Sequence, residues 1–195
     1  EMKKKLGKKT MESQKDLVEL ILLRQFIAIQ AIPYTIEMIE NALEMGRKVI
    51  VFTSFSEEQE IIANHFGKHA VRHNGSMSNV KKQHSVDQFQ NNDKIKVFIG
   101  NIKSAGVGIT LTEATVVIFN SFDWVPGNNE QAEDRAYRIG QNNDVNVYYQ
   151  LFEDTISTRM WEMLRNKKDI ISTIMGEKKL SDDEITDLLS EQLID

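Results

Sequence analysis

The side chains best suited to chemistry lie in the run QAEDRAYRIGQ at residues 131–141. If this run is a helix, Gln131, Arg135 and Arg138 share one face, and a glycine ends it. Arginine stays charged and carries a planar fork of donors, so two arginines on one face suit the binding of phosphate oxygens. The run is also typical of an ordinary capped helix, because acids come early, bases come late, and Asp134 is spaced to pair with Arg138. Taken alone, the run leaves both interpretations open.

A glycine-rich segment, SAGVGITLTEA at residues 104–114, follows an apolar run and could bring its backbone close to a ligand. Gly106 and Gly108 permit a tight turn, and neighbouring hydroxyl groups could reach phosphate oxygens. The segment is not a dinucleotide-binding fingerprint, because the third glycine and the following helix are missing. A plain tight connection is the alternative. The sequence has no G-x-x-x-x-G-K-[ST] loop, and Asp123 has no acidic companion. If the chain meets ATP, it supplies only part of the site.

Other catalytic or metal-binding sets find little support in the sequence. There is no cysteine, which excludes disulfides, thiolate catalysis and cysteine zinc sites. The four histidines do not share a face with carboxylates, so no metal ligands are expected. A Ser-His-Asp arrangement stays open, but no G-x-S-x-G motif supports one.

The elements that must position these residues are helices alternating with short strands. An apolar helix is expected at 13–32, ending before Pro33, and a second at 34–45, ending at Gly46. The expected strands are 48–55, 69–75, 95–100, 114–120 and 144–152. The further expected helices are 56–67, with Ser56 as cap and Gln59 or Glu60 completing it, then 78–90, 128–139 and 154–175. This alternation predicts an α/β fold with a mostly parallel sheet and helices on both faces.

In such sheets, chemistry lies outside the carboxyl ends of the strands. Those ends are expected at 53–55 (TSF), 73–76 (HNGS), 100–108 (GNIKSAGVG) and 120–124 (NSFDW).

Length and charge limit the kind of protein. A chain of 195 residues can bury one sizeable core with a small appendage. From residue 177 onward, seven acids against two lysines carry the whole net charge of −5, so the main body is neutral and its charge does not exclude a polyanion partner. No apolar run is expected to cross a membrane, and the basic start lacks the apolar core of a signal peptide. An intracellular location is therefore the default expectation.

The chain resembles a known family through the order of five segments. KVIVFTSF, HNGSMS, IKSAGVGITLTEA, FDWVP and QAEDRAYRIGQ follow one another as in the second RecA-like lobe of superfamily-2 helicases, and more narrowly as in SWI/SNF-type translocases of double-stranded DNA. The resemblance implies a three-layer α/β/α, P-loop NTPase-like lobe at 34–175. It also implies a helical segment at 1–33 that connects the lobes of the parent. The acidic tail at 176–195 is expected to be a short helix or disordered.

The same resemblance implies roles for single residues. Arg135 and Arg138 match the arginines that reach the γ-phosphate of ATP across the cleft between lobes, and Arg138 is expected to act as an arginine finger. Gly106, Gly108 and Gln131 match further nucleotide-binding positions. The positions that match contacts to the DNA backbone are Ser54, Phe55, Asn74, Gly75, Lys103 and Ser104.

Three features depart from the family's pattern. The acidic residues that often precede the tryptophan are reduced to Asp123. Val125 stands where the family usually has the asparagine of a Trp-Asn-Pro run. Lys82 stands where an arginine is usual, which keeps the charge but loses the bidentate fork.

The expected function follows from the resemblance. ATP and Mg²⁺ would bind in the two-lobed parent, whose N-terminal RecA-like lobe and duplex DNA are the expected partners, with no membrane involved. The isolated chain is expected to hydrolyse no ATP. The expected location is the nucleus in a eukaryote, or the cytoplasm in a bacterium or virus. Two alternatives stay open: an RNA-helicase lobe and a non-catalytic protein-docking module.

Overall fold

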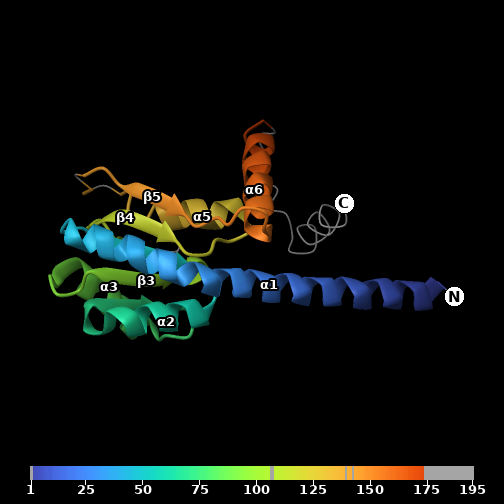
Figure 1. Ribbon diagram of the computed structural model, residues 1–195, viewed down its shortest axis with the longest axis horizontal. Coiled ribbons are helices and arrows are strands. Elements are labelled where there is room, and N and C mark those ends of the chain that lie inside the picture. The colour runs from blue at the N-terminus through green and yellow to red at the C-terminus, as the bar shows by residue number, and fades with distance from the viewer. Residues whose placement is uncertain (1, 106–107, 139, 142, 174–195) are drawn as a thin grey trace. The chain divides into compact units, whose positions relative to one another are not determined.

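One five-stranded parallel sheet forms the centre of the fold. The computed structural model of the protein describes residues 2–105, 108–138, 140–141 and 143–173 (Figure 1). The strands are β1 (Lys48–Thr53), β2 (Ala70–His73), β3 (Val97–Asn101), β4 (Ala114–Phe119) and β5 (Asn146–Tyr149). Their order in the sheet is β2-β3-β1-β4-β5, and each neighbouring pair is parallel. The parallel α/β fold predicted from the sequence is confirmed.

The chain divides into two compact units. Ala28–Phe152 holds the whole sheet, and the second unit combines the described residues of 1–27 with those from Glu153 onward. The sheet unit therefore starts before the expected boundary at residue 33 and ends well before the one at 175. The acidic tail and Gly106, about which the sequence also made predictions, lie outside the described residues.

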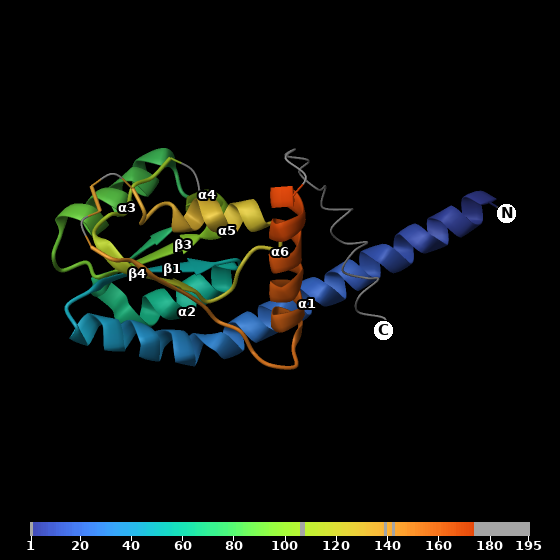
Figure 2. The ribbon, with the colours of Figure 1, turned by 90° about the horizontal axis from the view of Figure 1, so that it is seen from above.

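Helices cover both faces of the sheet (Figure 2). The helices are α1 (Met2–Glu44), α2 (Ser56–Phe66), α3 (Asn79–Asn91), α4 (Ile102–Ala105), α5 (Pro126–Glu133) and α6 (Ile156–Thr173), with a short 3₁₀ turn at Gly67–His69. On one face, α1 and α2 bury Ile32, Ile39 and Ile62 against the strands. On the other, Phe89 of α3 packs edge-on against Phe98 of β3, with ring centroids 5.5 Å apart. Successive strand residues point to opposite faces, which explains why the strand sequences are continuously apolar.

Helix α1 continues through Pro33, where the sequence predicted a break. Proline removes one backbone donor and usually ends or kinks a helix. Here the buried positions Ala28, Thr35 and Ile39 stay on one face across the proline, which itself is exposed. Packing against the sheet therefore outweighs the local cost of Pro33. The end of α1 agrees with expectation, because Gly46 follows it with a positive φ of 73°.

Within the described part of the chain, one helix is long and apolar enough to cross a membrane by length and composition, Leu17–Glu44. No such run was expected from the sequence, so that expectation is corrected. From Ala28 onward, the apolar residues of this helix belong to the core against the sheet, with Ile32 3% and Ile39 0% exposed. This packing explains why that half of the helix is apolar without a membrane.

Candidate functional site

Arg135 is buried and holds the glycine-rich segment to the chain that follows α5. Only 7% of the residue is exposed. Its Nε donates to the carbonyl of Gln131 at 2.8 Å, and its Nη1 donates to the carbonyl of Ile109 at 3.4 Å. The backbone adds a third connection, because the amide of Leu111 donates to the carbonyl of Arg135 at 2.9 Å. Burial, and secondly the charge of Arg138, lower the pKa of Arg135.

Arg138 lies on the surface, and its guanidinium is available to a ligand. Its Nη1 donates to Thr110 Oγ1 at 3.3 Å, so it stands beside the glycine-rich segment. Gly108 in that segment has φ of +74°, a conformation that side chains rarely adopt. Gln131 is also exposed. Three of the predicted nucleotide-binding residues, Gly108, Gln131 and Arg138, are therefore near the surface, whereas Arg135 is not.

The helix expected at 128–139 ends early, at Glu133. The amides of Arg135 and Ala136 donate to carbonyls three residues back, in a tightened turn, and the carbonyl of Arg135 is taken by Leu111. That carbonyl is the acceptor a continuing helix would need. The prediction that three side chains share one helical face is therefore wrong. No ion pair joins Asp134 to Arg138 among the contacts of the described residues.

Asn101 joins two of the turns at the carboxyl ends of the strands. Its Nδ2 donates to the carbonyl of Ser54 at 3.0 Å, and its Oδ1 accepts from the amide of Lys103 at 3.1 Å. The hydroxyl of Ser104 donates to the Asn101 carbonyl at 3.2 Å. The predicted DNA-facing residues Ser54, Lys103 and Ser104 thus lie around one asparagine that the sequence analysis did not single out.

Glu58, in the first turn of α2, is fully buried and accepts hydrogen bonds from the Ser54–Phe55 turn. Its Oε1 accepts from the amide of Phe55 at 2.8 Å and from that of Ser54 at 3.3 Å. The hydroxyl of Ser121 and the side-chain amide of Asn120 donate to the same carboxylate. Burial raises the pKa of Glu58, and these hydrogen bonds oppose the rise.

The start of α2 differs from expectation. Phe55, not Ser56, precedes the helix as its cap residue, and Glu58, not Gln59 or Glu60, accepts from the cap amide. Gln59 turns inward instead and is 1% exposed. Its Oε1 accepts from Asn74 Nδ2 at 3.3 Å, which connects the turn of Asn74 and Gly75 to α2.

The turn FDWVP is braced from within. Asn129 of α5 accepts from the amide of Asp123 at 2.8 Å and donates to its carbonyl at 2.7 Å. A carboxylate oxygen of Asp123 lies 4.0 Å from the ammonium of Lys103, whose side chain is 65% exposed. The lone acid noted in the sequence therefore faces a lysine of the neighbouring turn.

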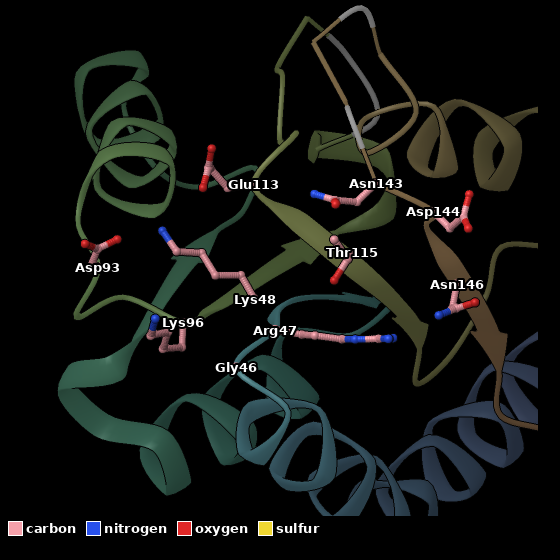
Figure 3. Close-up of a pocket in the computed structure, with 10 residues that line it drawn as sticks. All are labelled: Gly46, Arg47, Lys48, Asp93, Lys96, Glu113, Thr115, Asn143, Asp144 and Asn146. Atoms are coloured by element: carbon pink, nitrogen blue, oxygen red, sulfur yellow. The ribbon is translucent and has the colours of Figure 1, made fainter.

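The polar pocket drawn in Figure 3, about 630 Å³ in volume, lies at the other end of the sheet. Lys48 and Asn146, the first residues of their strands, help to line it. Lys48 is itself bonded to the chain, because its ammonium donates to the Phe89 carbonyl at 2.6 Å, and burial lowers its pKa. The other lining residues are Gly46, Arg47, Asp93, Lys96, Glu113, Thr115, Asn143 and Asp144. Cationic and acidic side chains are balanced there, and none of the predicted site residues lines this pocket.

Within the described ranges, no group of three or more histidine or acidic side chains could hold a metal ion. His73 is 1% exposed and lies beside Phe98, and burial lowers its pKa.

Comparison with known proteins finds one family model, the helicase conserved C-terminal domain, which matches residues 31–140. The chain is similar to the DNA annealing helicase and endonuclease ZRANB3 of Homo sapiens, at 43% identity over 56% of the chain. It is also similar to the helicase swr1 of Schizosaccharomyces pombe, at 34% identity over 67% of the chain. The chain spans about 10% of the length of each of these relatives.

Two solved structures share the fold. The SWI2/SNF2 ATPase core of Sulfolobus solfataricus in complex with double-stranded DNA aligns with a TM-score of 0.73 and 29% identity, over 93% of this chain and 41% of that one. The C-terminal part of the Fun30 ATPase domain aligns with a TM-score of 0.69 and 24% identity, over 85% of this chain and 53% of that one.

Proposed function

Since the chain belongs to the helicase conserved C-terminal domain family, as the C-terminal lobe of a SWI/SNF-type superfamily-2 ATPase, we propose that it serves an ATP-dependent translocase of double-stranded DNA. In this role it supplies an arginine finger to ATP held by the other lobe and part of the surface that follows the DNA backbone. The matched part of this chain spans about 10% of the length of these relatives, so we assign the remaining parts of the translocase to the rest of the parent protein.

The exposed guanidinium of Arg138 is the observation that carries the nucleotide role. It donates to Thr110 at 3.3 Å with one nitrogen, which leaves its remaining donors for another acceptor. A permanently charged, planar donor is suited to the charge that spreads over a transferred phosphoryl group. Arg138 is therefore the catalytic residue of this proposal, with Gln131, Gly106 and Gly108 as the proposed nucleotide-binding positions.

Arg135 acts differently in this proposal, by positioning rather than by touching ATP. One of its side-chain hydrogen bonds goes to the carbonyl of Gln131 in α5, and the other goes to the carbonyl of Ile109 in the glycine-rich segment. A buried arginine with both acceptors inside the protein has little freedom to reach a γ-phosphate. We propose that Arg135 holds Thr110 and Arg138 in their positions relative to each other.

The DNA-facing surface is proposed at the carboxyl ends of β1, β2 and β3. Lys103 supports it best, because its side chain is 65% exposed and its partner Asp123 is at the long distance of 4.0 Å. A DNA phosphate can replace that carboxylate as the counter-charge, and such contacts give affinity without reading sequence. Ser104, Asn74 and Gly75 complete this surface.

Ser54 and Phe55 belong to the same surface, but their backbone groups are already hydrogen-bonded within the protein. Both amides are engaged by Glu58, and the Ser54 carbonyl accepts from Asn101. The Ser54 hydroxyl is buried with no partner among the described atoms. We propose that this turn contacts the DNA backbone through its half-buried side chains.

ATP and Mg²⁺ fit this assignment only in the two-lobed parent. The sequence lacks a phosphate-binding G-x-x-x-x-G-K-[ST] loop, and the described residues contain no acidic cluster for the metal. The N-terminal RecA-like lobe would hold both, and this chain would add Arg138 from across the cleft. Binding to DNA places such a protein in the nucleus of a eukaryote, or in the cytoplasm of a bacterium or virus.

Turnover measurements on the parent protein test the proposal. We expect the isolated chain 1–195 to hydrolyse no ATP above background, and the two-lobed parent to do so with stimulation by duplex DNA. Structured RNA at the same nucleotide concentration is the matched alternative ligand. Stimulation by RNA alone would support an RNA-helicase lobe, and no nucleic-acid stimulation at all would refute the translocase.

A further inference from the structure

Two adjacent buried polar residues in the first turn of α2 hold two different turns of the proposed DNA surface. Glu58 is 0% exposed and accepts from the amides of Ser54 and Phe55. Gln59 is 1% exposed and accepts from the side chain of Asn74. One helical turn therefore sets the relation between the strand end of β1 and the strand end of β2.

The Glu58 carboxylate does more than cap the start of helix α2. A capping glutamate normally accepts from one backbone amide at the surface. Here the carboxylate has no cation beside it in its hydrogen-bond set and is held by four separate donors, two of them backbone amides of one turn. Leaving such a group buried without its donors is costly, so the conformation of the Ser54–Phe55 turn and the position of Glu58 depend on each other.

Asn120 extends this set of hydrogen bonds to helix α1. Its Nδ2 donates both to Glu58 and to the carbonyl of Ala28, the latter at 2.9 Å. Its Oδ1 accepts from the hydroxyl of Thr35 at 2.7 Å. Ala28 is where α1 enters the sheet unit, so the chain that arrives there is bonded, through one asparagine, to the carboxylate that holds the turn.

We propose that Glu58 is a positioning residue for DNA binding, and that Asn120 makes the Ser54–Phe55 turn sensitive to the position of α1. The ligand is the phosphate backbone of duplex DNA, so the inference rests on the proposed function. A shift of α1 breaks or reorients the hydrogen bonds of Asn120. The hydrogen bond from Asn120 to Glu58 then changes, and with it the affinity of the Ser54–Phe55 turn for one DNA phosphate.

The test uses the two-lobed parent and the variant Glu58→Gln. Glutamine keeps the shape but presents an NH₂ group to the Asn120 amide, which is also a donor. We expect the duplex-DNA concentration that gives half-maximal ATPase stimulation to rise about tenfold, as for loss of one charge-assisted hydrogen bond. Turnover at saturating DNA should change less than about twofold, since one such contact positions the DNA and takes no part in catalysis. The matched control is Glu60→Gln, an exposed glutamate on the same helix.

A second readout separates positioning from a general loss of structure. If one phosphate contact is lost, the slope of log affinity against log salt becomes shallower by about 0.9. A variant that is merely less stable lowers turnover without changing this slope. An unchanged half-saturating concentration and slope in a folded Glu58→Gln protein would overturn the inference.

Thr35→Val keeps the test decisive if Glu58→Gln fails to fold. It removes the hydroxyl that donates to Asn120 while preserving side-chain volume at a position that is 0% exposed. We expect a rise of about threefold in the half-saturating DNA concentration, as for loss of one neutral hydrogen bond, and the wild-type value would contradict the role of Asn120. Absence of DNA stimulation in the wild-type parent would instead refute the proposed function itself.

Discussion

Replacing Arg135 by alanine should destabilise the fold, whereas the same change at Arg138 should not. The 2.8 Å bond from Arg135 Nε to the carbonyl of Gln131 is charge-assisted, and such bonds contribute about 1.5–3 kcal/mol. The 3.4 Å contact to Ile109 is long and adds less, and relief of repulsion with Arg138 offsets part of the loss. We expect a loss of about 2–3 kcal/mol in the free energy of unfolding.

Thermal and urea unfolding of the purified chain, followed by circular dichroism, measure this loss. For a chain of this length it corresponds to a decrease of about 5–10 °C in the midpoint of thermal unfolding. Arg138→Ala is the matched control, because that exposed side chain makes one 3.3 Å contact and should cost less than about 1 kcal/mol. Equal midpoints for the two variants would refute the distinction between a positioning arginine and a free one.

Three further predictions concern the elements around the site. Gly100→Ala should destabilise the fold by about 1–3 kcal/mol in urea unfolding, because an added Cβ would lie 2.9 Å from the Cβ of Ala105; an unchanged midpoint would show that α4 yields freely. Asn129→Ala should cost about 1–3 kcal/mol by the same assay, because it leaves the amide and carbonyl of Asp123 without their partner, and a neutral result would mean that water replaces it. Because the folded protein raises the pKa of Glu58, protonation of this group contributes to the free energy of unfolding. The contribution is fully present below the ordinary pKa of 4.5 and is lost as the pH rises through the raised pKa. The unfolding free energy of wild type, relative to Glu58→Gln, should therefore fall as the pH rises above about 4.5, and a flat difference would contradict the direction of the shift.

The strands and their parallel arrangement were predictable because short β-branched runs between helical patterns have few other interpretations. Val49 and Val51 illustrate this, since both are 0% exposed in a strand covered on both faces. Recognition of the family was equally available, because the residues around Arg135 and Arg138 are specific in type and spacing. The family model that matches residues 31–140 confirms it.

The errors came from places where tertiary contacts decide. A helix break at Pro33 follows from local sterics, but packing of α1 on the sheet outweighs it. The helix before Arg135 ends at Glu133 in a tightened turn, and the Arg135 carbonyl accepts from Leu111, which is distant in sequence. Neither the packing of α1 on the sheet nor the hydrogen bond from Leu111 to Arg135 can be read from the pattern of residues in the sequence.

The residues that sequence reasoning missed are buried polar ones. The turns are held by hydrogen bonds of Glu58, Gln59, Asn101 and Asn120. Polar residues at strand ends and helix starts usually indicate surface positions, so their burial was not expected. The one available signal was Glu58 itself, an acid three residues after Phe55 at a helix start, which fits a capping interaction. Its complete burial could not be foreseen without the fold.

Arg138 is proposed to act on ATP across the cleft between the two lobes of the parent protein. Its most direct test is the turnover of the two-lobed parent at saturating ATP and duplex DNA, with Arg138→Ala compared with Arg72→Ala, an exposed arginine on β2. We expect Arg138→Ala to lower turnover by about 10³–10⁵-fold while the protein stays folded and still binds DNA, and Arg72→Ala to leave turnover unchanged. Turnover of Arg138→Ala within about threefold of wild type, far less than an arginine finger contributes, would contradict the account.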